Sequence, residues 1–167
     1  AHLYTRTAPV LSDKEGRLVS NYTLKDAPEH IIRDLIEREY PNDGDVHSRN
    51  ALYLLRCRHS SSREVVKREI VRGEDSYYDS PPNWIDKAFD ADRLYYVGRY
   101  SGDVRERILK HCRGTGANFT GIFPPVEIVT VKWIPGSEDT DRRERKLANQ
   151  IQESSENNGY SAYVYQF

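Results

Sequence analysis

Two tyrosines, an arginine, a histidine and a glutamate stand in an order and at spacings that suit phosphate chemistry. Arg107 and His111 are four residues apart, so in a helix they share one face and can reach one phosphate group. Tyr96 precedes them in the segment Tyr96-Val97-Gly98, and Tyr53 lies in an apolar run upstream. Glu144 follows further along the chain. These five side chains predict a site that binds and reacts with a phosphate.

Hydrolysis of a phosphodiester needs an activated water, neutralisation of the transition-state charge and help for the leaving oxygen. Arg107 can present a bidentate fork to phosphate oxygens, and His111 can hydrogen-bond the nucleophile or the phosphate near neutral pH. Glu144 is a hard oxygen ligand suited to Mg²⁺, which typically takes one or two carboxylates. The hydroxyls of Tyr53 and Tyr96 can orient the water. A tyrosine that acts as general base near pH 7 needs its pKa lowered by neighbouring cations or a metal.

The elements that must position these residues follow from hydrophobic periodicity. Strands are expected at 51–57, 94–99, 126–134 and 161–167, and helices at 26–40, 63–71, 83–89, 103–113 and 141–153. Asp26 with Glu29 and Asp103 with Glu106 form capping boxes, and Pro41 ends the first helix. The polar stretch 114–120 reads as a helix exit, or alternatively as backbone amides that touch a ligand. The pattern predicts an α+β fold in which helices pack on a sheet of about three strands, extended by the last segment.

The helix over 103–113 has a buried side and a functional side. Val104, Ile108 and Cys112 recur at every fourth position and form its core stripe. Arg107 and His111 lie about 100° around the helix from that stripe. We therefore expect both side chains to face a cleft.

The composition excludes several classes of protein. Of the 167 residues, 37% are hydrophobic and 31% are charged, and no apolar run approaches membrane-spanning length. No apolar leader is visible at the start of the chain. Cys57 and Cys112 are too few for a disulfide framework or a zinc site and are expected to be core thiols. A cytoplasmic protein with no membrane partner is the simplest interpretation.

Positive charge is local, because the net charge is −1. Two cationic clusters flank the five candidate residues, and both fit a phosphate-backbone partner. The candidate nucleic-acid-binding residues are Arg99, Arg105, Lys110, Arg113, Arg142, Arg143 and Lys146. On charge alone, two solvated helix faces are an equally good explanation.

The order of Tyr53, Tyr96-Val97-Gly98, the Arg107–His111 pair and Glu144 resembles the GIY-YIG nuclease family over roughly residues 50–158. The resemblance implies a small three-stranded mixed or antiparallel sheet with flanking helices. It differs from the family pattern in that Ala51 stands for a glycine and Val97 for an isoleucine. Residues 58–93 separate the two tyrosine motifs and are therefore expected to be an insertion.

The resemblance also implies a role for each residue. Tyr53 would be the general base, Tyr96 would hold the phosphate and water network, and Arg107 would stabilise the phosphate. His111 would assist the tyrosine, and Glu144 would bind a single Mg²⁺ or Mn²⁺ ion. Asn157 or Asn158 is the nearest match to a late asparagine of the family.

The sequence therefore predicts one nuclease domain over 1–167, with an N-terminal extension over 1–49 and the insertion over 58–93. The expected function is a metal-dependent endonuclease that cuts DNA, most simply double-stranded DNA. A non-catalytic nucleic-acid-binding protein on the same fold and an RNA-cleaving nuclease are the alternatives. A homodimer is left open.

Overall fold

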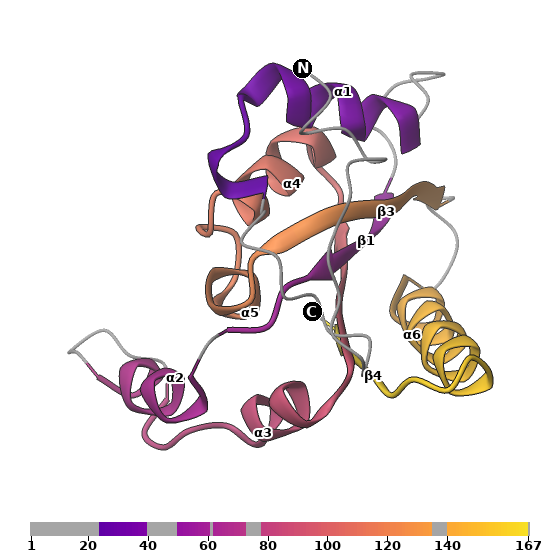
Figure 1. Cartoon of the computed structure of the whole chain (residues 1–167). Coiled ribbons are helices and arrows are strands. Elements are labelled where there is room, and N and C mark those ends of the chain that lie inside the picture. Colours follow the sequence, from indigo (N-terminus) through magenta and orange to yellow (C-terminus); the bar gives the residue numbers. More distant parts are fainter. Residues whose placement is uncertain (1–23, 40–49, 61, 73–77, 135–139, 167) are drawn as a thin grey trace.

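The computed structural model describes residues 24–39, 50–60, 62–72, 78–134 and 140–166, and Figure 1 shows their arrangement. A 3₁₀ turn, six α-helices and four strands follow one another in these residues. They are η2 (Leu24–Asp26), α1 (Glu29–Glu39), β1 (Asn50–Cys57), α2 (Arg63–Ile70), α3 (Asn83–Asp90), β2 (Arg93–Tyr100), α4 (Val104–Cys112), α5 (Asn118–Ile122), β3 (Pro125–Ile134), α6 (Thr140–Asn157) and β4 (Ala162–Gln166). The expected α+β class is confirmed.

The strands form one mixed sheet in the order β3-β1-β2-β4. β1 is antiparallel to both of its neighbours, whereas β2 and β4 are parallel. The sheet therefore has four strands rather than three. The fourth strand pairs along β2, with Leu94 opposite Tyr163 and Tyr96 opposite Tyr165.

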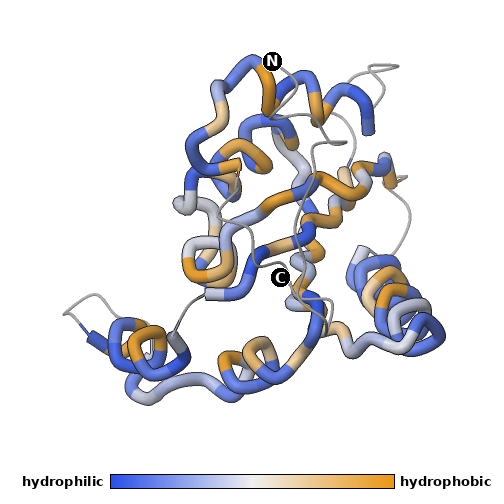
Figure 2. Tube along the Cα trace, viewed as in Figure 1, coloured by the Kyte–Doolittle hydropathy of each residue, from blue (hydrophilic) through white to orange (hydrophobic). Residues whose placement is uncertain are grey.

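Each face of the sheet is covered by its own set of helices. Figure 1 shows α1, α4 and α5 on one side and α6 on the other. Alternate residues of a strand point to opposite faces. Tyr53 and Leu55 accordingly join the core under α1, α4 and α5, whereas Leu52 and Leu54 pack against Leu147 of α6. Figure 2 shows apolar positions concentrated on the strands, with α1 and α6 largely hydrophilic.

Helix α4 forms as its sequence predicts. Asp103 is the N-cap, and its side chain accepts a hydrogen bond from the backbone N–H of Arg105 at 3.0 Å. Val104, Ile108 and Cys112 are fully buried. The expected core stripe of this helix is confirmed.

Three stretches differ from the expected elements by more than one residue. Helix α1 begins at Glu29 rather than at residue 26, and Asp26 belongs to the 3₁₀ turn before it. The carbonyl of Pro28 accepts the first bonds of the helix, from the N–H groups of Ile31 and Ile32 at 3.1 and 3.2 Å. Residues 114–120 are not an unstructured exit, because α5 begins at Asn118. Helix α6 runs on to Asn157, four residues past the expected end. Pro41 lies outside the described residues.

The 58–93 segment connects two neighbouring antiparallel strands and carries its own helices, α2 and α3. Ile85, Ala88 and Phe89 of α3 are buried in the main core. Arg63 of α2 forms an ion pair with Asp86 of α3 at 3.3 Å. The segment is thus a folded part of the domain. None of the helices in the described residues is both long enough and apolar enough to cross a membrane.

Candidate active site

A chain of hydrogen bonds links Tyr53 on β1, His111 on α4 and Thr120 on α5. The Tyr53 hydroxyl lies 2.8 Å from Nε2 of His111, and Nδ1 lies 2.9 Å from Oγ1 of Thr120. The Thr120 hydroxyl donates to the carbonyl of Ala117 at 3.3 Å. Since its proton is used there, its oxygen accepts from Nδ1–H, and Nε2 is left to accept from the tyrosine hydroxyl.

His111 does not face a cleft. It is fully buried, and both of its ring nitrogens are occupied by protein groups. Burial, with the nearby positive charge of Arg107, lowers the pKa of His111 to about 3. The expected contact of His111 with a nucleophile or a phosphate therefore has no geometric support: the histidine is neutral at physiological pH, and its Nε2 contacts Tyr53.

Tyr53 is the residue on which the other charged candidate side chains act. Burial raises its pKa to about 12, while the Arg107 guanidinium and the Tyr96 hydroxyl act in the opposite direction. The negative charge of Glu144 adds to the increase. A cation and a carboxylate from different helices thus act on one hydroxyl. Tyr53 is protonated at neutral pH unless further positive charge is supplied.

Tyr96 is the central ring of an aromatic stack. It is fully buried, 4.6 Å from the His111 ring and 6.2 Å from the Tyr53 ring between centroids. Tyr165 of β4 stacks on it at 5.8 Å. The buried Tyr96 hydroxyl makes no hydrogen bond of normal geometry within the described residues. Such a hydroxyl is typical of a functional site where water or substrate supplies the partner.

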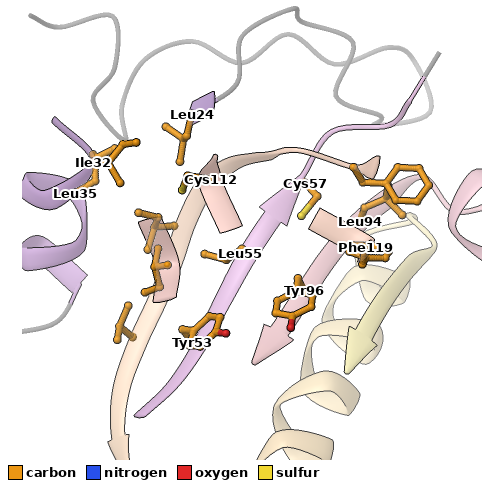
Figure 3. Close-up of a cluster of buried hydrophobic side chains, with 14 of the residues drawn as sticks. Leu24, Ile32, Leu35, Tyr53, Leu55, Cys57, Leu94, Tyr96, Cys112 and Phe119 are labelled. Carbon is orange, nitrogen blue, oxygen red and sulfur yellow. The ribbon is translucent and has the colours of Figure 1, made fainter. Parts of the chain in front are cut away.

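Two glycines leave room for these rings. Gly98 of β2 lies opposite Tyr53 of β1, and a Cβ on Gly98 would come 2.4 Å from the hydroxyl oxygen of Tyr53. A Cβ on Gly116 would come 2.5 Å from Nδ1 of His111. Figure 3 shows Tyr53 and Tyr96 side by side on adjacent strands. The glycine of the Tyr96-Val97-Gly98 motif is thus required by the tyrosine across the strand pair.

Glu144 reaches the site from the first turns of α6. Its side chain is almost fully buried, and Arg99 of β2 approaches its carboxylate at 3.6 Å. Arg99 also forms an ion pair with Asp141 at 2.7 Å and donates to the Thr140 hydroxyl. Arg99 therefore anchors the start of α6 and holds the glutamate in place.

A cleft of about 500 Å³ opens at this end of the sheet. Asn50, Arg99, Tyr100, Arg107 and Thr140 are among the residues that line it. The Arg107 guanidinium lies 5.8 Å from the centre of the exposed Tyr100 ring. Arg107 thus has one side toward Tyr53 and another toward solvent, as a phosphate ligand requires.

The remaining candidate residues are dispersed. Arg105 pairs with Glu37 of α1, and Arg113 donates to the backbone carbonyl of Lys25. Both arginines thus fasten the N-terminal helix region to α4. Lys110 on α4 and Arg142, Arg143 and Lys146 on α6 are exposed.

Asn157 and Asn158 lie at the far end of α6 from Glu144, about 20 Å along the helix axis. Asn158 donates from its side chain to the carbonyl of Ser154 at 2.8 Å and so closes the helix end. The assignment of an asparagine to the site therefore has no geometric support.

Several residues of the site carry no obvious signal in the sequence. Thr120 contacts His111 from nine residues further along the chain, inside a stretch that reads as a helix exit. Thr140, Asn50 and Tyr100 come together only because β1, β2 and α6 meet at one end of the sheet. The pairing of Tyr53 with Gly98 is the exception, since the motif contains that glycine.

The donor set fits a magnesium-type site better than a zinc-type site. Within the described residues there is no group of three or more His, Cys, Asp or Glu side chains that could hold a metal ion. A single buried carboxylate suits Mg²⁺ or Mn²⁺, because such ions need only one or two protein carboxylates and keep several waters. Glu144 is that carboxylate.

Comparison with known proteins adds no relative: no protein family, no curated protein and no solved structure matches this chain.

Proposed function

We propose that this protein is a metal-dependent endonuclease of the GIY-YIG type that hydrolyses DNA phosphodiester bonds. The observation that carries the proposal is the convergence of Tyr53, Arg107 and Glu144 from a strand and two helices, where the charges of Arg107 and Glu144 both act on the Tyr53 hydroxyl. Of the three, Arg107 also lines an open cleft. The charge of Arg107 lowers the pKa of Tyr53 and the charge of Glu144 raises it. These residues stand far apart in the sequence.

Each side chain has one task in this proposal. Arg107 would bind the non-bridging oxygens of the scissile phosphate with its planar fork. The Tyr53 oxygen would accept a hydrogen bond from the attacking water, because its own proton points to Nε2 of His111. His111 would keep the Tyr53 hydroxyl in that orientation. Tyr96 would hold the second side of the water through its buried hydroxyl.

Glu144 would hold a single Mg²⁺ or Mn²⁺ ion at the cleft. When bound, such an ion would stabilise charge on the phosphate and lower the pKa of a coordinated water. Its positive charge would also favour the ionised form of Tyr53, in the same direction as Arg107. This direction matters because a tyrosine with a pKa of about 12 is a poor base at neutral pH.

A purely binding protein would have little use for the buried parts of this arrangement. Glu144 is 2% exposed and repels a phosphate unless a cation intervenes, which favours catalysis over simple binding. The hydrogen-bonded His111 behind Tyr53 likewise serves an aligned hydroxyl rather than a cationic surface. DNA and RNA share the phosphate chemistry, so the choice of DNA rests on the family resemblance.

The proposal is tested with supercoiled plasmid incubated with the protein in Mg²⁺ and in EDTA. We expect nicked or linear DNA with Mg²⁺, no change in EDTA, and loss of cleavage in Glu144→Ala. Plasmid that stays supercoiled at every protein and metal concentration, while a structured RNA is cut, would transfer the proposal to RNA. Failure on both substrates would contradict it, and cleavage by Glu144→Ala equal to that of the wild type would contradict the metal assignment.

A further inference from the structure

Three arginines on the α6 side of the sheet lie outside the catalytic cleft. Arg56 is on β1, Arg58 follows the end of β1, and Arg93 begins β2. Tyr95, which lies opposite Arg56, packs with the residues under α6, so the two-residue period of a strand places all three arginines on this face. The register that pairs Cys57 with Leu94 puts position 58 opposite Arg93. We call these residues the arginine cluster.

Among the described residues, no carboxylate forms an ion pair with a member of the arginine cluster. The Nε atoms of Arg56, Arg58 and Arg93 are buried and have no hydrogen-bond partner there. Within the same part of the chain, no ion pair joins any of the three to a carboxylate. Glu127, opposite Arg56 on β3, acts on it only at a distance. Burial and the like charge of Arg93 lower the pKa of Arg56.

An aromatic ring contacts one member of the cluster. The Arg93 guanidinium lies 4.1 Å from the centre of the Tyr160 ring, within cation–π range. Tyr95, only 8% exposed, lies opposite Arg56. Like charges directly across a strand pair are destabilising. Glu127 offsets part of the charge of Arg56, but three half-buried cations facing this one carboxylate still carry excess positive charge and form a pre-organised site for an anion.

A shallow hollow of about 150 Å³ lies on the same face, between β3 and α6, on the way to the catalytic cleft. Lys132, Arg143 and Lys146 are the charged residues of its lining, and it contains no carboxylate from the described residues. Lys132 lies opposite Leu52 of β1. The catalytic cleft begins at Asn50. Cations therefore recur on this face at the cleft, in the hollow beside β3 and in the arginine cluster.

We propose that this face is a nucleic-acid track in which Arg56, Arg58 and Arg93 bind neighbouring backbone phosphates remote from the bond that is cut. Arginine suits this ligand because its planar fork matches phosphate oxygens. From Asn50 to Arg56 the strand advances about 20 Å at roughly 3.3 Å per residue. At about 3.4 Å per base pair this is about six base pairs of B-form DNA. The polymer in this inference rests on the proposed nuclease function.

The track is tested by the salt dependence of DNA binding. The probe is a fluorescently labelled DNA duplex of about three helical turns, and EDTA prevents cleavage. The variant carries Arg56→Gln, Arg58→Gln and Arg93→Gln. A control removes the same charge from three exposed positions on other helices, with Arg38→Gln, Arg68→Gln and Lys87→Gln.

The slope of log K against log salt is negative, and its magnitude decreases by about 0.9 for every phosphate that the protein no longer neutralises. We expect the slope of the cluster variant to fall in magnitude by about two to three and its affinity to weaken at least about tenfold, with the control close to wild type. A slope equal to that of the control would overturn the track. If the triple variant does not fold, the three single variants replace it. Each is expected to decrease the magnitude of the slope by about one. No change in any of them would also overturn the track.

A second readout separates this inference from the proposed function. Inorganic phosphate is expected to raise the melting temperature of the wild-type protein more than that of the cluster variant. Unchanged slopes with intact plasmid cleavage would remove the track and leave the nuclease. Absent cleavage with a phosphate effect that depends on the cluster would remove the nuclease and leave an anion site. Phosphate that stabilises both proteins equally would count against the cluster.

Discussion

His111 is enclosed by protein on both of its ring nitrogens, and this decides its protonation. The Tyr53 hydroxyl lies on one side and the Thr120 hydroxyl on the other. A buried ring that already accepts one hydrogen bond and donates another gains nothing from a second proton. The physical consequence is a neutral histidine whose task is to orient a tyrosine.

The protonation of His111 predicts how stability changes with pH. The pKa of this side chain is about 3 in the folded protein against 6.5 for an ordinary histidine. Between these values the unfolded chain binds a proton that the folded chain does not, so stability falls as the pH falls below about 6.5. From about pH 7 to about pH 5 the wild type should lose about 2 kcal/mol more unfolding free energy than His111→Gln.

Urea unfolding of the two proteins at both pH values measures this difference. Other acids and bases titrate in both proteins and cancel in the comparison. Equal decreases would mean that the imidazole is charged in the folded protein, and would contradict the hydrogen-bond assignment.

Gly98 is predicted to matter for catalysis because of Tyr53. A methyl group at this position would meet the Tyr53 ring at 2.4 Å, so the ring must move away from His111. We expect Gly98→Ala to lower the cleavage rate by about 100-fold, the scale of a misplaced catalytic group. The double variant Gly98→Ala with Tyr53→Phe should cleave no more slowly than Tyr53→Phe alone. Additive effects in this cycle would show that the glycine acts by another route.

At the scale of elements, α4 carries two residues of the proposed site, and its first turn depends on one cap. Asp103 caps the helix by accepting from the N–H of Arg105, and Arg107 and His111 follow within the same helix. Asp103→Ala should lower the free energy of unfolding by about 1 kcal/mol, whereas Asp103→Asn, which can also cap, should change it far less. Denaturant titration of the three proteins measures the difference. Equal stability of the alanine and asparagine variants would contradict the capping role.

The elements that the sequence could predict are those whose own periodicity defines them. The Val104-Ile108-Cys112 stripe specifies α4, and the apolar run around Tyr53 specifies β1. By contrast, the pairing of β4 with β2 depends on where the chain leaves α6, and local patterns do not contain that information. The same holds for Thr120, whose contact with His111 exists only after α5 has packed on α4.

Helix α1 begins later than the capping-box pattern predicts, and the cause is local. Asp26 and Glu29 have the spacing of a capping box, but a proline stands between them at position 28. The residue before a proline is disfavoured in the helical region, and proline suits a helix start. The chain therefore makes a short 3₁₀ turn and begins the helix at Glu29.

At the scale of the whole molecule, the two faces of the sheet divide the work. The face under α1, α4 and α5 buries the aromatic stack and fixes Tyr53, while the α6 face carries Glu144 and the cationic residues. The two faces meet at one end of β1 and β2, where the cleft opens. A net charge of −1 is compatible with the proposed nucleic-acid track, because Lys132, Arg143 and Lys146 line one hollow on the α6 face.

The most direct test of the nuclease site is the single-turnover rate of DNA cleavage in saturating Mg²⁺, compared between Tyr53→Phe and Tyr163→Phe. Both tyrosines have a pKa raised to about 12, but of the two only Tyr53 contacts His111 and lies near Arg107. The proposed site predicts a rate about 100-fold or more below wild type for Tyr53→Phe and a rate within about twofold of wild type for Tyr163→Phe. Equal rates for the two variants would contradict the assignment of this cleft as the catalytic site.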